Sequence, residues 1–292
     1  MFFRKDILVF AFLIFIKIFI YSESYHELAV CAIFQNEAPY LKEWIEFHKL
    51  VGVSKFYLYN NLSQDNYQTV LQPYIENEEV TLTEWNFNTN YDGSNWPTIQ
   101  TMAYNHAINN SKGKVKWLAI IDTDEFLFPV EKYSLIEFLQ DFEDFASIAV
   151  NWQLFGTSFV KKINENELMI EKLIYKANTN YLENTHIKSI VRPEFVEYCL
   201  NPHFCILKKG YCQVDTNKQP CYGPFNNILI DKLRINHYWT RDEYFFYHVK
   251  FQRRALWQDQ YIFEKARVLN KEGDLSIYKY LPELKKRIIA VN

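Results

Sequence analysis

Short apolar runs alternate with helix-like segments along the chain from residue 28 onward. Five runs have the length and the content of β-branched and aromatic residues that are typical of buried strands. They are LAVCAIF (28–34), KFYLYNN (55–61), EVTLTEW (79–85), VKWLAII (115–121) and ASIAVNW (146–152).

The first helix is predicted directly after the first strand. Asn36 is a plausible N-cap, Pro39 suits a first helical turn and Gly52 ends the pattern. Its predicted buried face, set by helical spacing, consists of Leu41, Trp44, Ile45 and His48.

Three more segments have helical character. They are 67–75, limited in length by Pro73, then 97–110 and 134–142. Strands that alternate with helices predict an α/β fold, with a mostly parallel central sheet flanked by helices on both faces.

The N-terminal segment 1–24 is distinct from the predicted α/β domain. Arg4 and Lys5 precede the apolar run ILVFAFLIFIKIFIY, which is interrupted by Lys17, and small residues follow at Ser22 and Ser24. As a helix this run spans about 22 Å, less than a hydrocarbon core of about 30 Å.

This order of basic, apolar and small residues predicts a secretory signal that is cleaved near Ser24. The alternative is an uncleaved signal-anchor, lengthened by Phe2 and Phe3 and tolerating a snorkelling Lys17. A buried core helix is disfavoured because the run has no polar face. Both the cleaved signal and the signal-anchor predict an exported or membrane-anchored protein. In a eukaryote it would lie in the secretory pathway or the Golgi lumen, and in a bacterium it would lie in the cell envelope or be secreted.

Composition sets the remaining bounds. The 292 residues suffice for one large domain or two small ones. The net charge of −3 argues against a nucleic-acid-binding protein that relies on a basic face. Four of the five cysteines, Cys199, Cys205, Cys212 and Cys221, lie close together, which predicts one or two local disulfides, with free buried thiols as the alternative.

Polar residues gather where the predicted strands end. Residues 35–37 follow the first strand, 60–61 end the second and 122–124 follow the fourth. Ligands of open parallel sheets bind beyond the carboxyl ends of the strands. We therefore expect these three clusters to line one crevice.

Asp122 and Asp124 form a D-x-D motif at a strand end, which suits a divalent cation. Their side chains would point to opposite sides of an extended chain, so a turn at Thr123 is needed to bring both near one ion. Carboxylate oxygens select Mg²⁺ or Mn²⁺, ions that commonly also hold substrate phosphates. A solvated loop or a helix cap is the alternative for so short a motif.

Five segments in this order resemble glycosyltransferase family 92: CAIFQNEAPYLKEWIEFHKLVGVSKFYLYNNLSQD, KWLAIIDTDEFLFP, NWQLFGTSF, KSIVRPEFVE and INHYWTRDEYFFYHVKFQRR. The resemblance covers roughly residues 29–257. It implies a single Rossmann-like domain of the GT-A type over 25–292. The nucleotide-binding half would be 25–145 and the acceptor half 146–292.

The resemblance also implies a metal site. Asp122 would lie near the ribose or the metal, Asp124 would ligate the metal directly, and His237 would complete the shell. The ion, Mn²⁺ or Mg²⁺, would act as a Lewis acid on the leaving diphosphate. For His237 the alternative is a core histidine, and His203 is a weaker candidate for shaping the site.

Four residues match positions that face the uracil and ribose of the donor: Asn36, Glu37, Asn60 and Asn61. Their alternatives are a helix cap for Asn36 and a turn for Asn60 and Asn61.

Lys250, Arg253 and Arg254 have the spacing of one helical face, which can clamp a diphosphate. A solvated basic face is the alternative. Lys188 and Arg192 are similar but less specific.

The acceptor half begins at NWQLFG, which contains Trp152, Phe155 and Gly156. An aromatic side chain there can stack on a sugar ring or pack in the core.

The implied activity is transfer of a sugar from a nucleotide-diphospho-sugar to a glycan or other hydroxyl acceptor. The family suggests UDP-galactose as donor and inversion at the sugar carbon. A carboxylate must then take the acceptor proton. We favour Asp259 over Glu243, because Glu243 has the capping-box spacing to Thr240 and Asp242 shares that first turn.

Other classes of function fit the sequence less well. An aspartyl phosphohydrolase wants Thr or Val where this chain has Phe126, and a dinucleotide-binding dehydrogenase wants a G-x-G-x-x-G that is missing from FQNEAP. A non-catalytic carbohydrate- or nucleotide-sugar-binding protein would not need the metal acids and the late histidine together.

Overall fold

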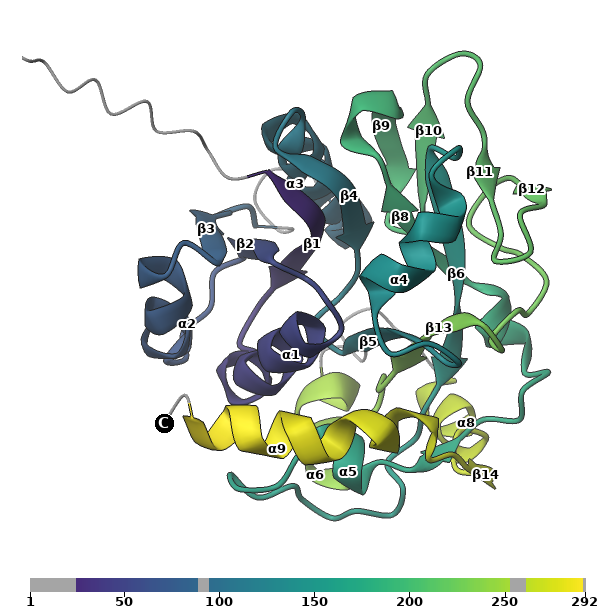
Figure 1. Cartoon of the computed structure of the whole chain (residues 1–292). Helices are drawn as coiled ribbons and strands as arrows, with labels where there is room; N and C mark the ends of the chain where they lie inside the picture. Colours follow the sequence, from purple (N-terminus) through teal and green to yellow (C-terminus); the bar gives the residue numbers. More distant parts are fainter. Residues whose placement is uncertain (1–24, 89–94, 253–260, 291–292) are drawn as a thin grey trace, which may run out of the picture.

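The computed structural model describes residues 25–88, 95–252 and 261–290 (Figure 1). The strands are β1 His26–Phe34, β2 Lys55–Asn60, β3 Val80–Glu84, β4 Val115–Ile120, β5 Glu125–Pro129, β6 Ser147–Leu154, β7 Tyr175–Lys176, β8 Ile187–Val191, β9 Val196–Asn201, β10 Phe204–Leu207, β11 Gln213–Val214, β12 Pro220–Cys221, β13 Leu233–His237 and β14 Glu272–Gly273.

The α-helices are α1 Ala38–Leu50, α2 Tyr67–Glu76, α3 Trp96–Ser111, α4 Leu135–Leu139, α5 Met169–Lys172, α6 Glu243–Phe245, α8 Ile262–Arg267 and α9 Leu281–Ala290. Short 3₁₀ turns occupy Gln140–Phe142, Leu182–Thr185, Pro193–Phe195 and Ser276–Tyr280, and a π-helix occupies Phe246–Lys250.

The central sheet has the strand order β12-β11-β6-β8-β4-β1-β2-β3. The strands β4, β1, β2 and β3 run parallel, as predicted, but β8 runs antiparallel to both β4 and β6. The sheet is therefore mixed rather than mostly parallel. The chain between β6 and β8 contains only the one-turn helix α5, the short strand β7 and a 3₁₀ turn, whereas parallel neighbours are usually joined by a longer crossover helix.

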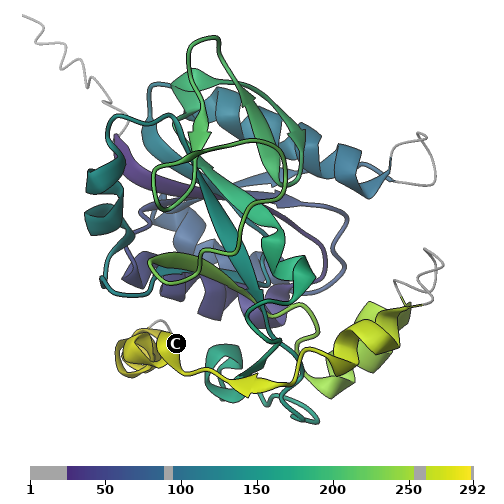
Figure 2. The same ribbon diagram turned by 90° about the vertical axis from the view of Figure 1, so that its right-hand side faces the viewer.

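Two apolar cores lie on opposite faces of this sheet. Leu28, Val30 and Ala32 of β1 face the core that contains α1, α2, α4 and α9, whereas Ala29 and Cys31 face the core under α3. Figure 2 shows α1 and α3 on the two sides of the sheet. Because both faces of β1 are covered, its sequence is a continuous apolar run.

Helix α1 buries the predicted face, since Leu41, Trp44, Ile45 and His48 are all fully covered. The expected N-cap is wrong. Glu37 takes the cap position without a side-chain cap bond. Asn36 is left-handed at φ 56°, and its Oδ1 accepts a hydrogen bond from the Gln64 amide at 2.7 Å, so it serves the loop after β2 instead.

The second half of the chain contains a β9–β10 hairpin that is closed by a disulfide between Cys199 and Cys205. Cys31, Cys212 and Cys221 are free thiols. One local disulfide is thus present. Among the described residues, no helix combines the length and the apolar character that crossing a membrane requires. Residues 1–24 lie outside the described part of the chain.

Candidate active site

The ends of β1 and β2 are joined by hydrogen bonds. Gln35 Nε2 donates to the Asn61 carbonyl at 2.8 Å, and the Ala38 amide donates to Asp65 Oδ2 at 2.8 Å. These contacts bring together two of the three polar clusters that the sequence predicts to share a crevice.

The side-chain amides of Asn60 and Asn61 donate hydrogen bonds to the end of β3 and to the segment that follows it. Asn60 Nδ2 donates to Glu84 at 2.7 Å, and Asn61 Nδ2 donates to the carbonyls of Trp85 and Phe87. Both side chains are buried, so they fix the loop after β2. A direct contact with a nucleotide stays a prediction for both.

Glu37 points from the start of α1 to a buried arginine that the sequence analysis did not single out. Its carboxylate pairs with Arg241, which has 1% of its surface exposed. The guanidinium lies 3.7 Å from the ring centre of Tyr40 and 4.4 Å from that of Phe245. The pair joins the end of β1 to the segment after β13.

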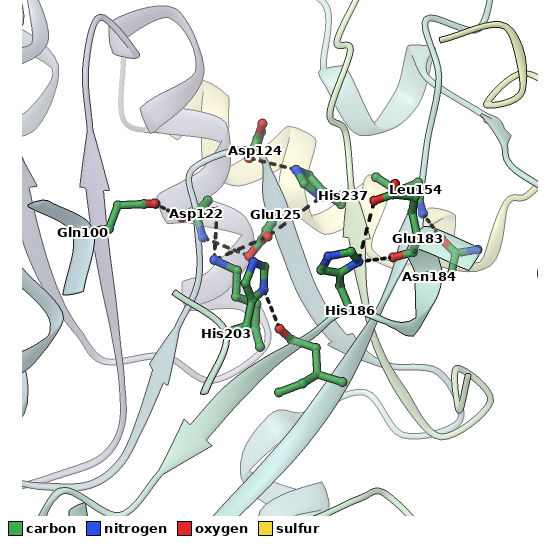
Figure 3. Close-up of polar contacts among 12 residues, drawn as sticks. Gln100, Asp122, Asp124, Glu125, Leu154, Glu183, Asn184, His186, His203 and His237 are labelled. Atoms are coloured by element: carbon green, nitrogen blue, oxygen red, sulfur yellow. Dashed lines mark hydrogen bonds and ion pairs between the residues drawn. The ribbon is translucent and has the colours of Figure 1, made fainter. Parts of the chain in front are cut away.

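Asp122 is held by three donors at the end of β4. Lys188 Nζ lies 2.8 Å from Oδ2, and the Tyr104 hydroxyl lies 3.0 Å from Oδ1. Gln100 Nε2 lies 3.3 Å from the same Oδ1 (Figure 3). Lys188 comes from β8 and its side chain is 1% exposed. Burial alone would lower its pKa, but Asp122 and Glu125 outweigh burial and raise it, so the ammonium stays charged.

Asp124 faces a different set of partners. The turn expected at Thr123 forms, with the Glu125 amide donating to the Asp122 carbonyl at 3.1 Å. Asp124 Oδ1 then lies 3.4 Å from His237 Nε2, and Oδ2 lies 3.5 Å from Lys250 Nζ. His237 reaches this position because β13 pairs with β5, which places it opposite Glu125.

The electrostatics of this cluster favour an ionised Asp124 beside a neutral imidazole. Burial lowers the pKa of His237 below its ordinary value. Burial alone would raise the pKa of Asp124, but His237, Lys250 and Arg241 together hold it below its usual range. Since a neutral ring carries no charge, Lys250 and Arg241 are the cations that keep Asp124 ionised at neutral pH.

Glu125 completes the acidic cluster and had no role assigned from the sequence. It is fully buried, and its Oε2 accepts a hydrogen bond from the Asp122 amide at 3.0 Å. Burial raises its pKa well above the usual range, and Lys188, 3.7 Å away, does not cancel this effect. The carboxyl group of Glu125 therefore supports the turn of the motif from a fully buried position.

Helix α1 fixes the strand that follows these acids. Trp44 Nε1 donates to the Glu125 carbonyl at 2.8 Å, and His48 Nε2 accepts from the Leu127 amide at 3.2 Å. His48 Nδ1 donates to the Trp44 carbonyl at 2.8 Å, which fixes the tautomer. The apolar face of α1 thus carries two polar contacts that position β5.

Asp124 and His237 fit a divalent cation as an oxygen and a nitrogen ligand. His237 Nε2 is the ring nitrogen that faces Asp124, whereas Nδ1 is buried without a hydrogen bond to the described residues and lies 3.9 Å from Glu125 Oε1. Asp122 does not share this place, because its oxygens are taken up by Lys188, Tyr104 and Gln100. Within the described ranges, no three His, Cys, Asp or Glu side chains are grouped to hold a metal ion.

Of the site residues predicted between 250 and 259, Lys250 lies in the described part of the chain. Lys250 ends the π-helix and also lies 5.0 Å from the ring centre of Trp239. Arg253, Arg254 and Asp259 lie outside the described residues, so the predicted basic face and the favoured base remain predictions.

The capping box predicted between Thr240 and Glu243 does not form. Asp242 is the N-cap of α6, with its Oδ1 accepting from the Phe245 amide at 2.7 Å and its Oδ2 from the Ile163 amide at 2.8 Å. The Thr240 hydroxyl donates instead to the Arg241 carbonyl. Glu243 lies in the first turn of α6 with no capping duty, so the capping box gives no reason to rank Glu243 below Asp259 as the base.

Trp152 lies at the centre of a group of imidazoles. Its ring centre is 4.4 Å from that of His237, 4.9 Å from that of His186 and 5.0 Å from that of His203. Phe155 is fully buried in the main core.

Two further residues have structural duties. A side chain at Gly156 would overlap Asn270, so glycine is required there. Arg192 donates to the Glu143 carbonyl at 2.8 Å and lies over Trp117.

The fold and site define an α/β protein with an acidic, histidine-containing cluster at the strand ends. Residues 26–227 match the sequence profile of glycosyltransferase family 92. The chain belongs to this family.

Relatives among characterised sequences agree with this assignment. The chain is 27% identical to a glycosyltransferase family 92 protein of Arabidopsis thaliana, over 63% of this chain and 32% of that protein. It is 26% identical to a family member of Ricinus communis, over 74% of this chain and 36% of that protein. It is also 26% identical to the beta-1,4-galactosyltransferase galt-1 of Caenorhabditis elegans, over 62% of this chain and 43% of that protein. The chain thus spans about a third of the length of these plant relatives.

Solved structures show weaker similarity. Staphylococcus aureus TarS in complex with UDP-GlcNAc has a TM-score of 0.38 and 11% identity, covering 60% of this chain and 49% of that one. The mannosyltransferase PcManGT of Pyrobaculum calidifontis, in complex with GDP-Man and Mn²⁺, has a TM-score of 0.34 and 14% identity, covering 59% and 46%. TM-scores below 0.5 do not establish a common fold.

Proposed function

We propose that this chain transfers a sugar from a nucleotide-diphospho-sugar to a hydroxyl group of a glycan or other acceptor, with a divalent cation. One observation carries the proposal: in a member of glycosyltransferase family 92, Asp124, His237 and Lys250 meet where β4 and β13 end. A carboxylate with an imidazole 3.4 Å away and an ammonium 3.5 Å away matches the needs of a metal-bound diphosphate.

The donor to test first is UDP-galactose. The relative from C. elegans is named a galactosyltransferase, which supports this choice. The remaining predicted donor contacts, Asn36, Glu37, Asn60 and Asn61, lie on the loops that follow β1 and β2 and belong to the same proposal.

In the proposed mechanism, Asp124 and His237 would hold Mn²⁺ or Mg²⁺. The ion, when bound, supplies Lewis acidity to the diphosphate leaving group. Lys250 adds positive charge on the same side, while the Glu37–Arg241 pair fixes the segment after β13. If the sugar carbon is inverted, a carboxylate on the opposite face takes the acceptor proton, and Asp259 and Glu243 are the two candidates.

The same proposal includes export or membrane anchoring through residues 1–24. The disulfide between Cys199 and Cys205 supports an oxidising compartment. Mass spectrometry of the native N-terminus separates the two forms, since a start near Tyr25 means cleavage and Met1 means an anchor.

The decisive experiment follows the products from UDP-galactose and Mn²⁺ with a mixture of glycan acceptors. We expect UDP and a galactosylated product, both lost in EDTA and restored by added Mn²⁺. Equal turnover in EDTA would contradict the metal. Release of UMP and galactose 1-phosphate in place of UDP would indicate a phosphohydrolase, and binding of UDP-galactose with no turnover would indicate a non-catalytic binding protein.

A further inference from the structure

A hollow lies between the turn that precedes β8 and the segment 225–227. Its volume is about 650 Å³, within the usual range of roughly 300–1,000 Å³ for small-molecule sites. One wall is the 3₁₀ turn Leu182–Thr185 with His186, and the other is the segment 225–227.

Its lining combines exposed apolar surface with neutral polar groups. Leu182 is 77% exposed and Phe225 is 54% exposed, and amides of Asn226 and Asn227 lie beside them. The seven described lining residues include Glu183 but no Lys or Arg. A lining without cations is poorly suited to a diphosphate, whereas an aromatic face beside amides and a carboxylate suits a pyranose ring.

The two walls are held together by backbone pairing. The Asn226 amide donates to the Thr185 carbonyl at 2.8 Å, and the Ile187 amide donates to the Pro224 carbonyl at 3.1 Å. Asn184 is fully buried and its side chain bonds to three backbone groups across the loop and β6. A hollow built on fixed backbone needs little ordering when a ligand enters.

The ring of Phe225 is also held in place. It meets the His186 ring edge to face, with centres 4.6 Å apart, and His186 Nδ1 donates to the Glu183 carbonyl at 2.9 Å. The aromatic wall is therefore preformed although it is exposed.

An aromatic bridge joins this hollow to the acids. His186 stacks on Trp152 with ring centres 4.9 Å apart, and the Trp152 ring also contacts His237, at 4.4 Å. His237 in turn faces Asp124. Figure 3 shows His186 and Glu183 on one side of His237 and the acids of the motif on the other.

A second connection starts from Glu183, on the same wall as His186. Glu183 pairs with Lys265 at 3.2 Å, and Lys265 and Lys250 both lie over the ring of Trp239, at 5.2 and 5.0 Å. Along the first connection, Trp152 is thus the one side chain between the lining residue His186 and His237, which is proposed to hold the metal ion.

We propose that this hollow binds the acceptor carbohydrate: a neutral pyranose whose C–H face lies on Phe225 and Leu182 and whose hydroxyls pair with Asn226, Asn227 and Glu183. This inference rests on the proposed function. It assigns the acceptor to the His186 end of the aromatic bridge, with Asp124 beyond the His237 end.

The test compares Phe225→Ala with Tyr198→Ala, a similarly exposed aromatic on the β9–β10 hairpin that does not line the hollow. Two activities are measured: hydrolysis of UDP-galactose without acceptor, and transfer to the acceptor mixture. Phe225→Ala should raise the KM for acceptor about ten-fold, the scale of one lost aromatic contact, and leave hydrolysis unchanged. Leu182→Ala should act in the same direction, and Tyr198→Ala should change neither activity.

A binding measurement separates this inference from the proposed function. Saturation-transfer NMR of the full chain uses methyl glycosides of galactose, glucose, mannose and N-acetylglucosamine, without donor. We expect at least one to receive a signal that Phe225→Ala abolishes and Tyr198→Ala retains.

If neither hydrolysis nor transfer is found but that signal is present, the proposed function fails and the carbohydrate site stands. If the wild type transfers sugar and the acceptor KM of Phe225→Ala is unchanged, the hollow is not the acceptor site. Absence of any Phe225-dependent glycoside signal would likewise overturn the assignment. Melting temperatures of all variants should match that of the wild type, since the substituted side chains are exposed.

Discussion

Lys188 Nζ lies 2.8 Å from Asp122 Oδ2, so the first acid of the D-x-D motif is neutralised by a buried lysine of the protein itself. This contact divides the motif. Asp122 is bound to β8 and α3, and Asp124 is left to face His237 and Lys250. We infer that the two aspartates have different duties.

The first prediction concerns this ion pair. Lys188→Met should lower the free energy of unfolding by about 2–3 kcal/mol, because it leaves Asp122 without its cation at a partly buried site. Asp122→Asn leaves the more deeply buried ammonium of Lys188 without its anion and should cost at least as much. The double variant should be more stable than the sum of the single effects implies. Urea unfolding of all four proteins gives the coupling, and additive effects would show that the contact contributes nothing.

The second prediction concerns Asp124. Asp124→Asn should reduce transfer by about 100-fold or more, because a metal-bound leaving group depends on several kcal/mol of charge stabilisation. It should also remove any rise in melting temperature that Mn²⁺ and UDP give the wild type. The control is Asp141→Asn, an exposed acid on another part of the surface. Wild-type turnover in Asp124→Asn would exclude it as a ligand.

The third prediction separates a ligand from a packed ring at His237. His237→Asn should weaken Mn²⁺ binding about ten-fold or more, as measured by calorimetry with UDP present. The matched control is His203→Asn, which removes another imidazole in contact with Trp152 and breaks a hydrogen bond to the Ile187 carbonyl. That variant should lose stability and keep its Mn²⁺ affinity. Equal Mn²⁺ affinity in both variants would assign His237 to packing alone.

The fourth prediction is a pH dependence. Glu43 is buried, accepts hydrogen bonds from the Met169 and Ile170 amides, and burial raises its pKa to about 7. The folded state therefore binds this proton more tightly than the unfolded chain does. Its contribution is complete below the ordinary pKa near 4.5 and is lost as pH rises towards 7.

The measurement is the difference in melting temperature between the wild type and Glu43→Gln from pH 4.5 to 7.5. The wild type should lose stability relative to the variant across this range. The difference is needed because burial lowers the pKa of His48 to about 3, and that group changes stability with the opposite sign as the pH rises. A pH-independent difference would show that Glu43 does not titrate there.

The sequence correctly predicted the strands that are buried on both faces and the helix that is buried along one face. The strands β1 and β4 are covered on both faces and read as apolar runs, and the buried face of α1 follows helical spacing. The strand ends then place Asp122 and Asp124 correctly, because the acids directly follow β4. These predictions need only local periodicity.

The partners of those acids could not be found in the same way. Lys188 sits in IKSIV, where a lysine on a short strand suggests an edge exposed to solvent, yet it is buried because its partner Asp122 lies 66 residues away. Arg241 in TRDE resembles a surface turn, and its partner Glu37 lies 204 residues away. Such pairs become visible only when the fold brings the segments together.

The last prediction decides what Glu37 does. The sequence suggested a donor contact, whereas the structure pairs its carboxylate with Arg241 in a buried place between Tyr40 and Phe245. Removing one member of a buried ion pair typically costs about 3–5 kcal/mol. We expect Arg241→Met to reach that range, and Glu37→Gln to cost less because its amide keeps an acceptor for the guanidinium. If the pair is the main duty of Glu37, Glu37→Gln should lower the melting temperature while the KM for UDP-galactose stays within about two-fold, a change below 0.5 kcal/mol. A ten-fold rise in that KM with an unchanged melting temperature would instead make Glu37 a donor-binding residue, as the sequence first suggested.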